Sequence, residues 1–147
     1  MSNLERVKKE VINVLAVDVN YLAILVAAIV SMVTGSVWYG PLFGKTWRQL
    51  VGKTEESVRK GAVQAMVIAA VSALVTAYVL AYISSYAQAS TWQEGAVVGF
   101  WVWLGFVATT LLVHASFEDK PKNLYLLNVG SHLIEFVVMG AIIGAWV

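Results

Sequence analysis

The sequence contains no cysteine, so it can form no disulfide, no thiol nucleophile and no thiolate metal site. It has two histidines, His114 and His132, and the H-x-x-E spacing of His132 and Glu135 supplies two metal ligands where three or four are needed. No serine and histidine form a recognisable nucleophilic motif. We therefore predict no catalytic residues, no metal site and no cofactor, and we expect that the protein is not an enzyme.

Charged residues are also scarce. They make up 13% of the chain, against about 25% in average soluble proteins, while hydrophobic residues make up 59% and the mean hydropathy is +0.74. The charges are segregated along the sequence. Charge-free gaps run from Asp18 to Lys45, from Lys60 to Glu94 and from Glu94 to Glu118, and the segment after Lys122 contains only Glu135.

Each gap holds at least the roughly 20 apolar residues that cross a bilayer core of about 30 Å. We predict an all-α membrane protein, an antiparallel bundle of four transmembrane helices at residues 21–39, 62–83, 95–113 and 124–146. This transmembrane domain would cover residues 20–147.

Residues 1–19 are predicted to form a short amphipathic helix. Ser2 and Glu5 have the spacing of a capping box at a helix start. The apolar stripe consists of Leu4, Val7, Val11, Val14 and Leu15. Such a helix would lie in the headgroup plane of the bilayer or pack on the loops of the same chain.

Lysine and arginine predict the orientation in the cell membrane. Most fall in the loops after the first and third spans: Lys45, Arg48, Lys53, Arg59, Lys60, Lys120 and Lys122. Fewer precede the first span: Arg6, Lys8 and Lys9. Because cytoplasmic loops are enriched in these residues, we expect the two basic loops in the cytoplasm and both termini outside. A net charge of +1 gives no reason to expect a nucleic-acid partner, and the lipid bilayer is the predicted partner.

Small residues recur at intervals of four in the predicted spans, where they favour close helix packing in lipid. They are Ala23, Ala27, Ser31 and Gly35; Ala65, Ala69, Ala73, Ala77 and Ala81; Gly95 and Gly99; and Gly140 and Gly144. The pattern predicts a compact bundle and favours a homo-oligomer or a larger membrane complex. The alternative is that every small-residue face is used within one protomer.

The segment "GSVWYGPLFGKTW", residues 35–47, follows the first span. Pro41 should end that helix near Gly40, because proline lacks an N–H donor and disfavours helix at the preceding residue. The interfacial signature comprises Trp38, Tyr39, Pro41, Phe43, Lys45 and Trp47. It is interpreted as a helix-end turn with aromatic anchors, or as a pocket for a lipid or small ligand. Glu118 or Asp119 of "FEDKP" could pair there with Lys45 or Arg48.

The fourth span contains Glu135 near the membrane midplane, where an ionisable residue is costly. One helical face carries Asn128, Ser131, His132, Glu135 and Met139. With His114 and Glu118 on the third span, this face suggests a proton relay, a cation path or a ligand site. The alternative is a protonated Glu135 that is hydrogen-bonded to His132, or to Ser31, Thr34 or Ser72, and stabilises helix packing.

The sequence resembles the domain-of-unknown-function 1761 family of small membrane proteins, whose first span ends in a W-Y-x-P-x-x-F-G-K-x-W-like signature. The resemblance continues through "AYVLA" (77–81), "WVWLGF" (101–106), "FEDKP" (117–121) and "NVGSHLIEFVVMGAIIGAW" (128–146), and covers the chain from Asn20 to its C-terminus. It implies a four-helix membrane domain and brings no activity and no catalytic residues. In the family, apolar or small residues often occur at the position of Glu135.

Two functions are compatible with these patterns. The first is a structural or accessory oligomeric membrane component without catalytic activity, which the small-residue faces favour. The second is a small proton- or cation-coupled transporter or channel that uses Glu135 and His132.

Overall fold

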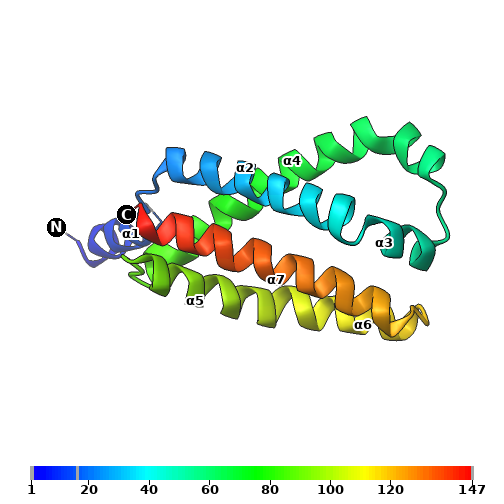
Figure 1. Ribbon diagram of the computed structural model, residues 1–147. Coiled ribbons are helices and arrows are strands. Elements are labelled where there is room, and N and C mark those ends of the chain that lie inside the picture. The colour runs from blue at the N-terminus through cyan, green and yellow to red at the C-terminus, as the bar shows by residue number, and fades with distance from the viewer. Residues whose placement is uncertain (1, 16, 147) are drawn as a thin grey trace.

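The computed structural model describes residues 2–15 and 17–146, and these residues form helices and no strand. The elements are α1 (Asn3–Leu15), α2 (Tyr21–Val37), η1 (Trp38–Leu42), α3 (Gly44–Val51), α4 (Glu55–Tyr86), α5 (Trp92–Val102), η2 (Trp103–Ala108), α6 (Thr109–Phe117) and α7 (Lys122–Ala145) (Figure 1). Four continuous helical stretches are long and apolar enough to cross a membrane: Tyr21–Leu42, Glu55–Tyr86, Trp92–Phe117 and Lys122–Ala145.

The two ends of the bundle differ. At one end, which we call the basic end, lie α3 and the connection between α6 and α7 (Figure 1). At the other, the terminal end, α2 begins and α7 ends, close to the turn between α4 and α5 (Figure 1).

Side-chain caps determine where several helices begin. Asn20 Oδ1 accepts hydrogen bonds from the backbone N–H groups of Leu22 and Ala23 at the start of α2. Thr54 Oγ1 accepts from Ser57 N at the start of α4. Each cap satisfies backbone donors that the first helical turn leaves free.

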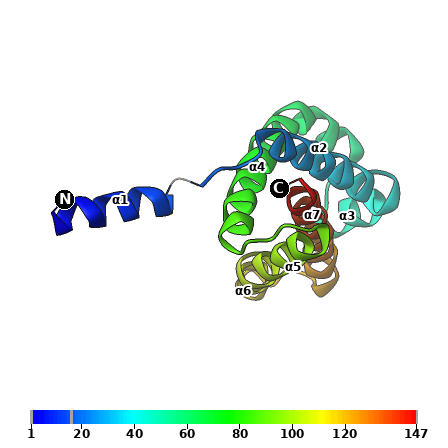
Figure 2. The same cartoon turned by 90° about the vertical axis from the view of Figure 1, so that its left-hand side faces the viewer.

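The predicted capping box of α1 is also present. Ser2 N donates to Glu5 Oε2 over 3.0 Å and Glu5 N donates to Ser2 Oγ over 3.2 Å. Figure 2 shows α1 standing apart from the other helices. Leu4, Val7 and Val11 of its apolar stripe are exposed. The side chains of Val14 and Leu15, like residues 1, 16 and 147, lie outside the described part of the chain.

The first helix ends close to Pro41, but two residues later than the predicted end near Gly40. The helix continues to Leu42 through the π-helical turn η1, which contains Pro41. Phe43 N donates to Trp38 O over 2.8 Å, and this i to i+5 bond closes the wider turn. A wider turn accommodates the proline ring and the missing N–H, which a regular α-helical turn does not. A single residue, Phe43, then separates η1 from α3.

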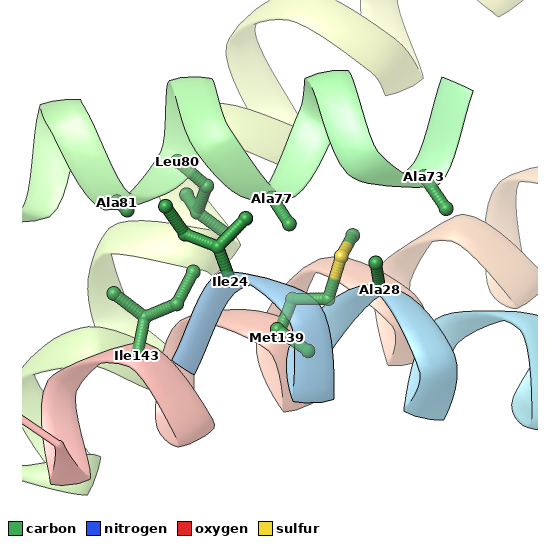
Figure 3. Packing of buried hydrophobic residues seen from close by; sticks show 9 residues of the cluster. Ile24, Ala28, Ala73, Ala77, Leu80, Ala81, Met139 and Ile143 are labelled. Atoms are coloured by element: carbon green, nitrogen blue, oxygen red, sulfur yellow. The ribbon is translucent and has the colours of Figure 1, made fainter. Parts of the chain in front are cut away.

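The core lies where α2, α4 and α7 meet, with α7 in the middle of the bundle (Figure 2). Alanines of α2 and α4 let the helices approach, and Leu80, Met139 and Ile143 fill the space between them (Figure 3). The full cluster is Ile24, Ala27, Ala28, Ala73, Ala77, Leu80, Ala81, Met139 and Ile143.

The closest helix contact joins α5 and α7 through glycines. A Cβ atom built on Gly95 would meet the backbone oxygen of Gly140, and one built on Gly140 would meet the backbone oxygen of Gly95. A Cβ on Gly99 would meet the backbone oxygen of Phe136. The predicted GxxxG face of the fourth span therefore lies against the paired glycines of the third span.

The alanine series of α4 is only half covered. Ala73, Ala77 and Ala81 are buried, whereas Ala65 and Ala69 are exposed. No residue from 55 to 72 is buried, and Figure 1 shows α4 diverging from α2 and α7 towards its N-terminal end. The helix thus has one half in the core and one half without cover in the protomer.

Candidate functional site

A polar face runs along α7 from the basic end to the middle of the helix. It carries Asn128, Ser131, His132 and Glu135, whose spacings of three and four residues place them on one side of an α-helix. Ser131 is fully buried, and Asn128, His132 and Glu135 are half-buried. We call these four residues the polar face.

His132 and Glu135 form a pair within this face. His132 Nδ1 lies 2.9 Å from Glu135 Oε2, and the exposed fractions of the two side chains are 39% and 16%. The histidine forms the outer edge of the pair and the carboxyl group its inner side. One hydrogen bond joins the two groups whether the proton is on the imidazole nitrogen or on the carboxyl group, since this nitrogen can donate or accept.

Glu135 packs against α2 at Gly35. A Cβ atom on Gly35 would lie 3.2 Å from Glu135 Oε1, so the absence of a side chain leaves room for the carboxyl group. Of the alternative partners, Thr34 Oγ1 donates to Val30 O in its own helix and Ser72 is exposed on α4. No hydrogen bond joins Ser31, Thr34 or Ser72 to Glu135 in the described residues, and Glu135 pairs with His132 on its own helix.

Two residues of the interfacial signature reach into the bundle and bind α7. Tyr39 OH donates to Asn128 Oδ1 over 3.0 Å, and Trp38 Nε1 donates to the Leu127 carbonyl over 3.2 Å. Phe43 packs on Trp38 with ring centroids 4.6 Å apart, and Trp47 packs edge-on against Tyr39 at 5.8 Å. Trp38 and Tyr39, expected as aromatic anchors of a helix-end turn, thus also bind α7, since half-buried indole and phenol groups need hydrogen-bond partners.

The other members of the signature stay at the surface. Pro41 and Lys45 are exposed at the basic end. Arg48 Nη2 lies 3.9 Å from Glu55 Oε2. The expected pairing of Lys45 or Arg48 with Glu118 or Asp119 is wrong in the described residues, since Arg48 has a partner closer along the chain.

Trp103 contacts α7 from another neighbouring helix, and the sequence alone did not single it out. Its Nε1 donates to the Val129 carbonyl over 3.0 Å. Trp38 begins η1 and Trp103 begins η2, so both π-helical turns start at a tryptophan that binds the backbone of α7. The available signal was "WVWLGF" itself, but its apolar composition does not distinguish a π turn from a regular helix.

His114 and Glu118 lie at the basic end, separate from the pair. His114 Nδ1 is 3.7 Å from Glu118 Oε1, and Glu118 also forms a salt bridge with Lys120. The hydrogen bond and charge of Lys120, and then the charge of His114, lower the pKa of the exposed Glu118 carboxyl group. A small cavity of about 50 Å³ joins this area to the polar face; it is lined by Leu111, His114, Ala115, Lys120, Leu124, Tyr125 and Asn128.

The predicted series of Glu118, His114, His132 and Glu135 is thus arranged as two pairs, with Asn128 and the small cavity between them. A cavity of this size has room for about one or two water molecules. On the other side of the pair, Met139 and Ile143 belong to the apolar core. Within the described residues, no group of three His, Asp or Glu side chains lies close enough to hold a metal ion.

Comparison with known proteins gives one result for nearly the whole chain. Residues 22–144 match the family described as "Protein of unknown function (DUF1761)". No match was found among curated proteins or among solved structures. The match spans all four long apolar helices and includes η1, η2 and the polar face. The chain therefore belongs to the DUF1761 family of proteins of unknown function.

Proposed function

We propose that the protein is a structural or accessory component of a membrane assembly, without catalytic activity, and that it associates with further copies of itself. In this proposal the four long helices cross the cell membrane in antiparallel order, with the basic end in the cytoplasm. The uncovered half of α4 carries the proposal.

Ala65 and Ala69 continue the four-residue spacing of Ala73, Ala77 and Ala81, a row that winds around α4 by about 40° per step. The last three are covered by α2 and α7 in the core, whereas the first two are exposed. In lipid, helices associate by close packing, so an exposed face of small residues is suited to a further helix. Larger apolar residues such as Val63 and Val67 occupy another face of the same half and suit contact with acyl chains.

The exposed edge of the polar face supports the same assembly. Met139, one turn beyond Glu135 on α7, is covered by the second half of α4, but His132 is 39% exposed where α4 has diverged. An imidazole facing hydrocarbon is unfavourable unless a polar or protein neighbour covers it. A helix of another protomer packed on Ala65 and Ala69 would provide cover on this side of the bundle.

Cysteine cross-linking tests the assembly directly, because the natural chain contains no cysteine. We expect Ala65→Cys and Ala69→Cys to form disulfide-linked dimers in native membranes under mild oxidation. The matched controls Val63→Cys and Val67→Cys, on a different face of the same turns, should cross-link at least several-fold less. The measurement is the dimer fraction on non-reducing gels.

Equal cross-linking at all four positions would indicate random collision and contradict the proposal. A cross-linked product that contains a different protein, identified by mass spectrometry, would replace self-association with a larger complex. A protein that elutes as a lone monomer in mild detergent and forms no cross-link would contradict both.

A second function, proton or cation coupling, is favoured by one observation, the 2.9 Å contact of His132 and Glu135 in the middle of an apolar helix. Beyond Glu135, Met139 and Ile143 of α7 belong to the apolar core, and the described residues of α7 past Glu135 include no further ionisable side chain. For this reason we place this function second. It would require either that the proton or cation binds at the pair and leaves by the way it entered, or that a path across the membrane forms between protomers.

Flux measurements in liposomes distinguish the two functions. If the pair couples transport, Glu135→Gln should reduce pH-driven flux at least ten-fold and leave cross-linking at Ala65→Cys unchanged. Glu56→Gln, in an exposed pair with Lys60 outside the predicted relay, is the matched control and should retain flux. Equal flux for wild type and Glu135→Gln would exclude a coupling role for the pair.

A further inference from the structure

A second cavity lies at the terminal end, away from the polar face. It is a groove of about 390 Å³ lined by Asp18, Val19, Asn20, Ala23, Ala81, Ser85, Ile143 and Trp146. These residues come from the chain before α2, from α2 itself, from α4 and from the end of α7. The volume lies in the range of about 300–1,000 Å³ that is usual for small-molecule sites.

Small residues create the groove and a side-chain contact fixes its rim. Ala23 and Ala81 form buried walls, with exposed fractions of 1% and 4%, so larger residues there would fill the space. Asn20 caps α2 with Oδ1 and donates from Nδ2 to the Trp146 carbonyl over 3.0 Å. This bond connects the start of α2 to the end of α7, so the two sides of the rim are held together.

The lining combines apolar walls, one aromatic ring and one negative charge. Val19, Ala23 and Ile143 are apolar, Trp146 is aromatic, and Asp18 is the single charged residue of the lining. No described residue forms an ion pair with Asp18. The nearest lysines and arginines along the chain are in α1, and all others lie beyond residue 44, near or towards the basic end.

We propose that the groove binds an alkylammonium group: a primary or quaternary ammonium carried on an apolar chain. The ammonium group sits beside the Asp18 carboxylate and the Trp146 ring, which attract a cation through charge and through the π face. The apolar chain lies on Ala23, Ala81 and Ile143. The group belongs either to a free amphiphilic amine or to an amine-bearing lipid headgroup at the membrane surface. This site is independent of the proposed assembly, because it uses neither the uncovered half of α4 nor the polar face.

Calorimetric titration of the full chain in nanodiscs of phosphatidylglycerol tests the proposal, with empty nanodiscs as the blank. Decyltrimethylammonium and decylamine should bind saturably, whereas decyl sulfate and decanol should show only the signal of the empty discs. Asp18→Asn should raise the Kd of decyltrimethylammonium at least ten-fold. Asp119→Asn, an exposed carboxylate at the basic end, is the matched control and should leave the Kd unchanged.

A second variant reports on the groove without changing charge. Ser85→Phe places a large side chain in the lining and should weaken binding of both amines, while the unfolding transition followed by tryptophan fluorescence shows that the bundle is intact. Equal affinity of wild type and Asp18→Asn, or binding of decanol as tight as that of decyltrimethylammonium, would overturn the proposal.

Nanodiscs with added phosphatidylethanolamine distinguish the two sources of the ammonium group. If the lipid headgroup is the occupant, its addition should raise the apparent Kd of decyltrimethylammonium for wild type. If a free amine is the occupant, the Kd should not depend on this lipid. Both outcomes support an alkylammonium site and assign its ligand.

Discussion

Gly140→Leu should prevent α5 from packing on α7 and should destabilise the protein by about 3 kcal/mol or more, at the upper end of the effect of overpacking. The reason is the backbone contact between the helices. A Cβ atom at Gly140 would meet the Gly95 carbonyl and would lie 3.2 Å from Gly99 N. Backbone atoms cannot rotate away as a flexible side chain can, so the two helices would have to separate.

Gly61→Leu is the matched control for this prediction. Gly61 lies in the exposed half of α4, and a Cβ atom there has no neighbour within 4 Å. The same substitution should be neutral or should stabilise by about 0.5–1 kcal/mol through helix propensity. Unfolding in increasing fractions of SDS, followed by tryptophan fluorescence, measures both variants. Equal transitions for Gly140→Leu and wild type would show that the glycine contact does not hold α5 on α7.

Removing one member of the His132–Glu135 pair should lower the free energy of unfolding more than removing both. His132→Leu leaves the Glu135 side chain, which is 16% exposed, without its hydrogen-bond partner, at a cost of about 1–3 kcal/mol. Glu135→Met leaves His132 unpaired, but it should lower the free energy of unfolding by less, because the imidazole is more exposed than the carboxyl group. The double variant removes both polar groups and should be close to wild type, since replacing a buried polar pair by apolar groups of similar size is often nearly neutral.

A double-mutant cycle over these three variants and the wild type gives the coupling free energy, again from SDS unfolding. Lys60 and Glu56 are the matched pair for comparison: they lie 2.8 Å apart on exposed helix surface. Lys60→Gln and Glu56→Gln should each change stability by less than about 0.5 kcal/mol. If the losses of unfolding free energy in the two single variants add up to the loss in the double variant, the His132 and Glu135 side chains are not coupled in the folded protein.

The exposed edge of the pair bears on both functions. If a second protomer covers His132, the cycle should give a larger coupling free energy in assembled protein than in protein dissociated by detergent, because a drier environment strengthens a hydrogen bond. The structural and the transport roles therefore involve the same residues, but only the transport role requires Glu135 to exchange a proton or cation.

Helix positions and helix starts were accessible from the sequence because they depend on local chemistry. The long apolar helices follow the charge-free gaps, since a bilayer core excludes charge over a length of about 20 residues. The caps at Ser2 and Thr54 depend on hydrogen bonds to residues three positions away. Family membership was also accessible, because the matching blocks lie along nearly the whole chain.

The course of the first helix past Pro41 was not accessible. Proline alone predicts a helix end, and only the π turn of η1, with the Trp38 indole bound to the Leu127 carbonyl, explains why the helix continues. Trp103 was missed for the same reason, since its partner is a backbone atom 26 residues away. Backbone carbonyls carry no sequence signature, so such contacts are known only once helices are placed side by side.

The sequence by itself determined which segments are apolar enough to enter a membrane, where the helices begin and which residues share a face of each helix, because these properties depend on neighbours within one or two turns. The tertiary structure alone decided which faces meet. It placed the glycines of α5 on those of α7, left Ala65 and Ala69 uncovered, and placed Glu135 against Gly35. The physical reason is that close packing between helices depends on the crossing angle and the backbone separation of each helix pair. Small residues permit a close contact at many positions, and only the arrangement of the whole bundle determines which of these contacts form.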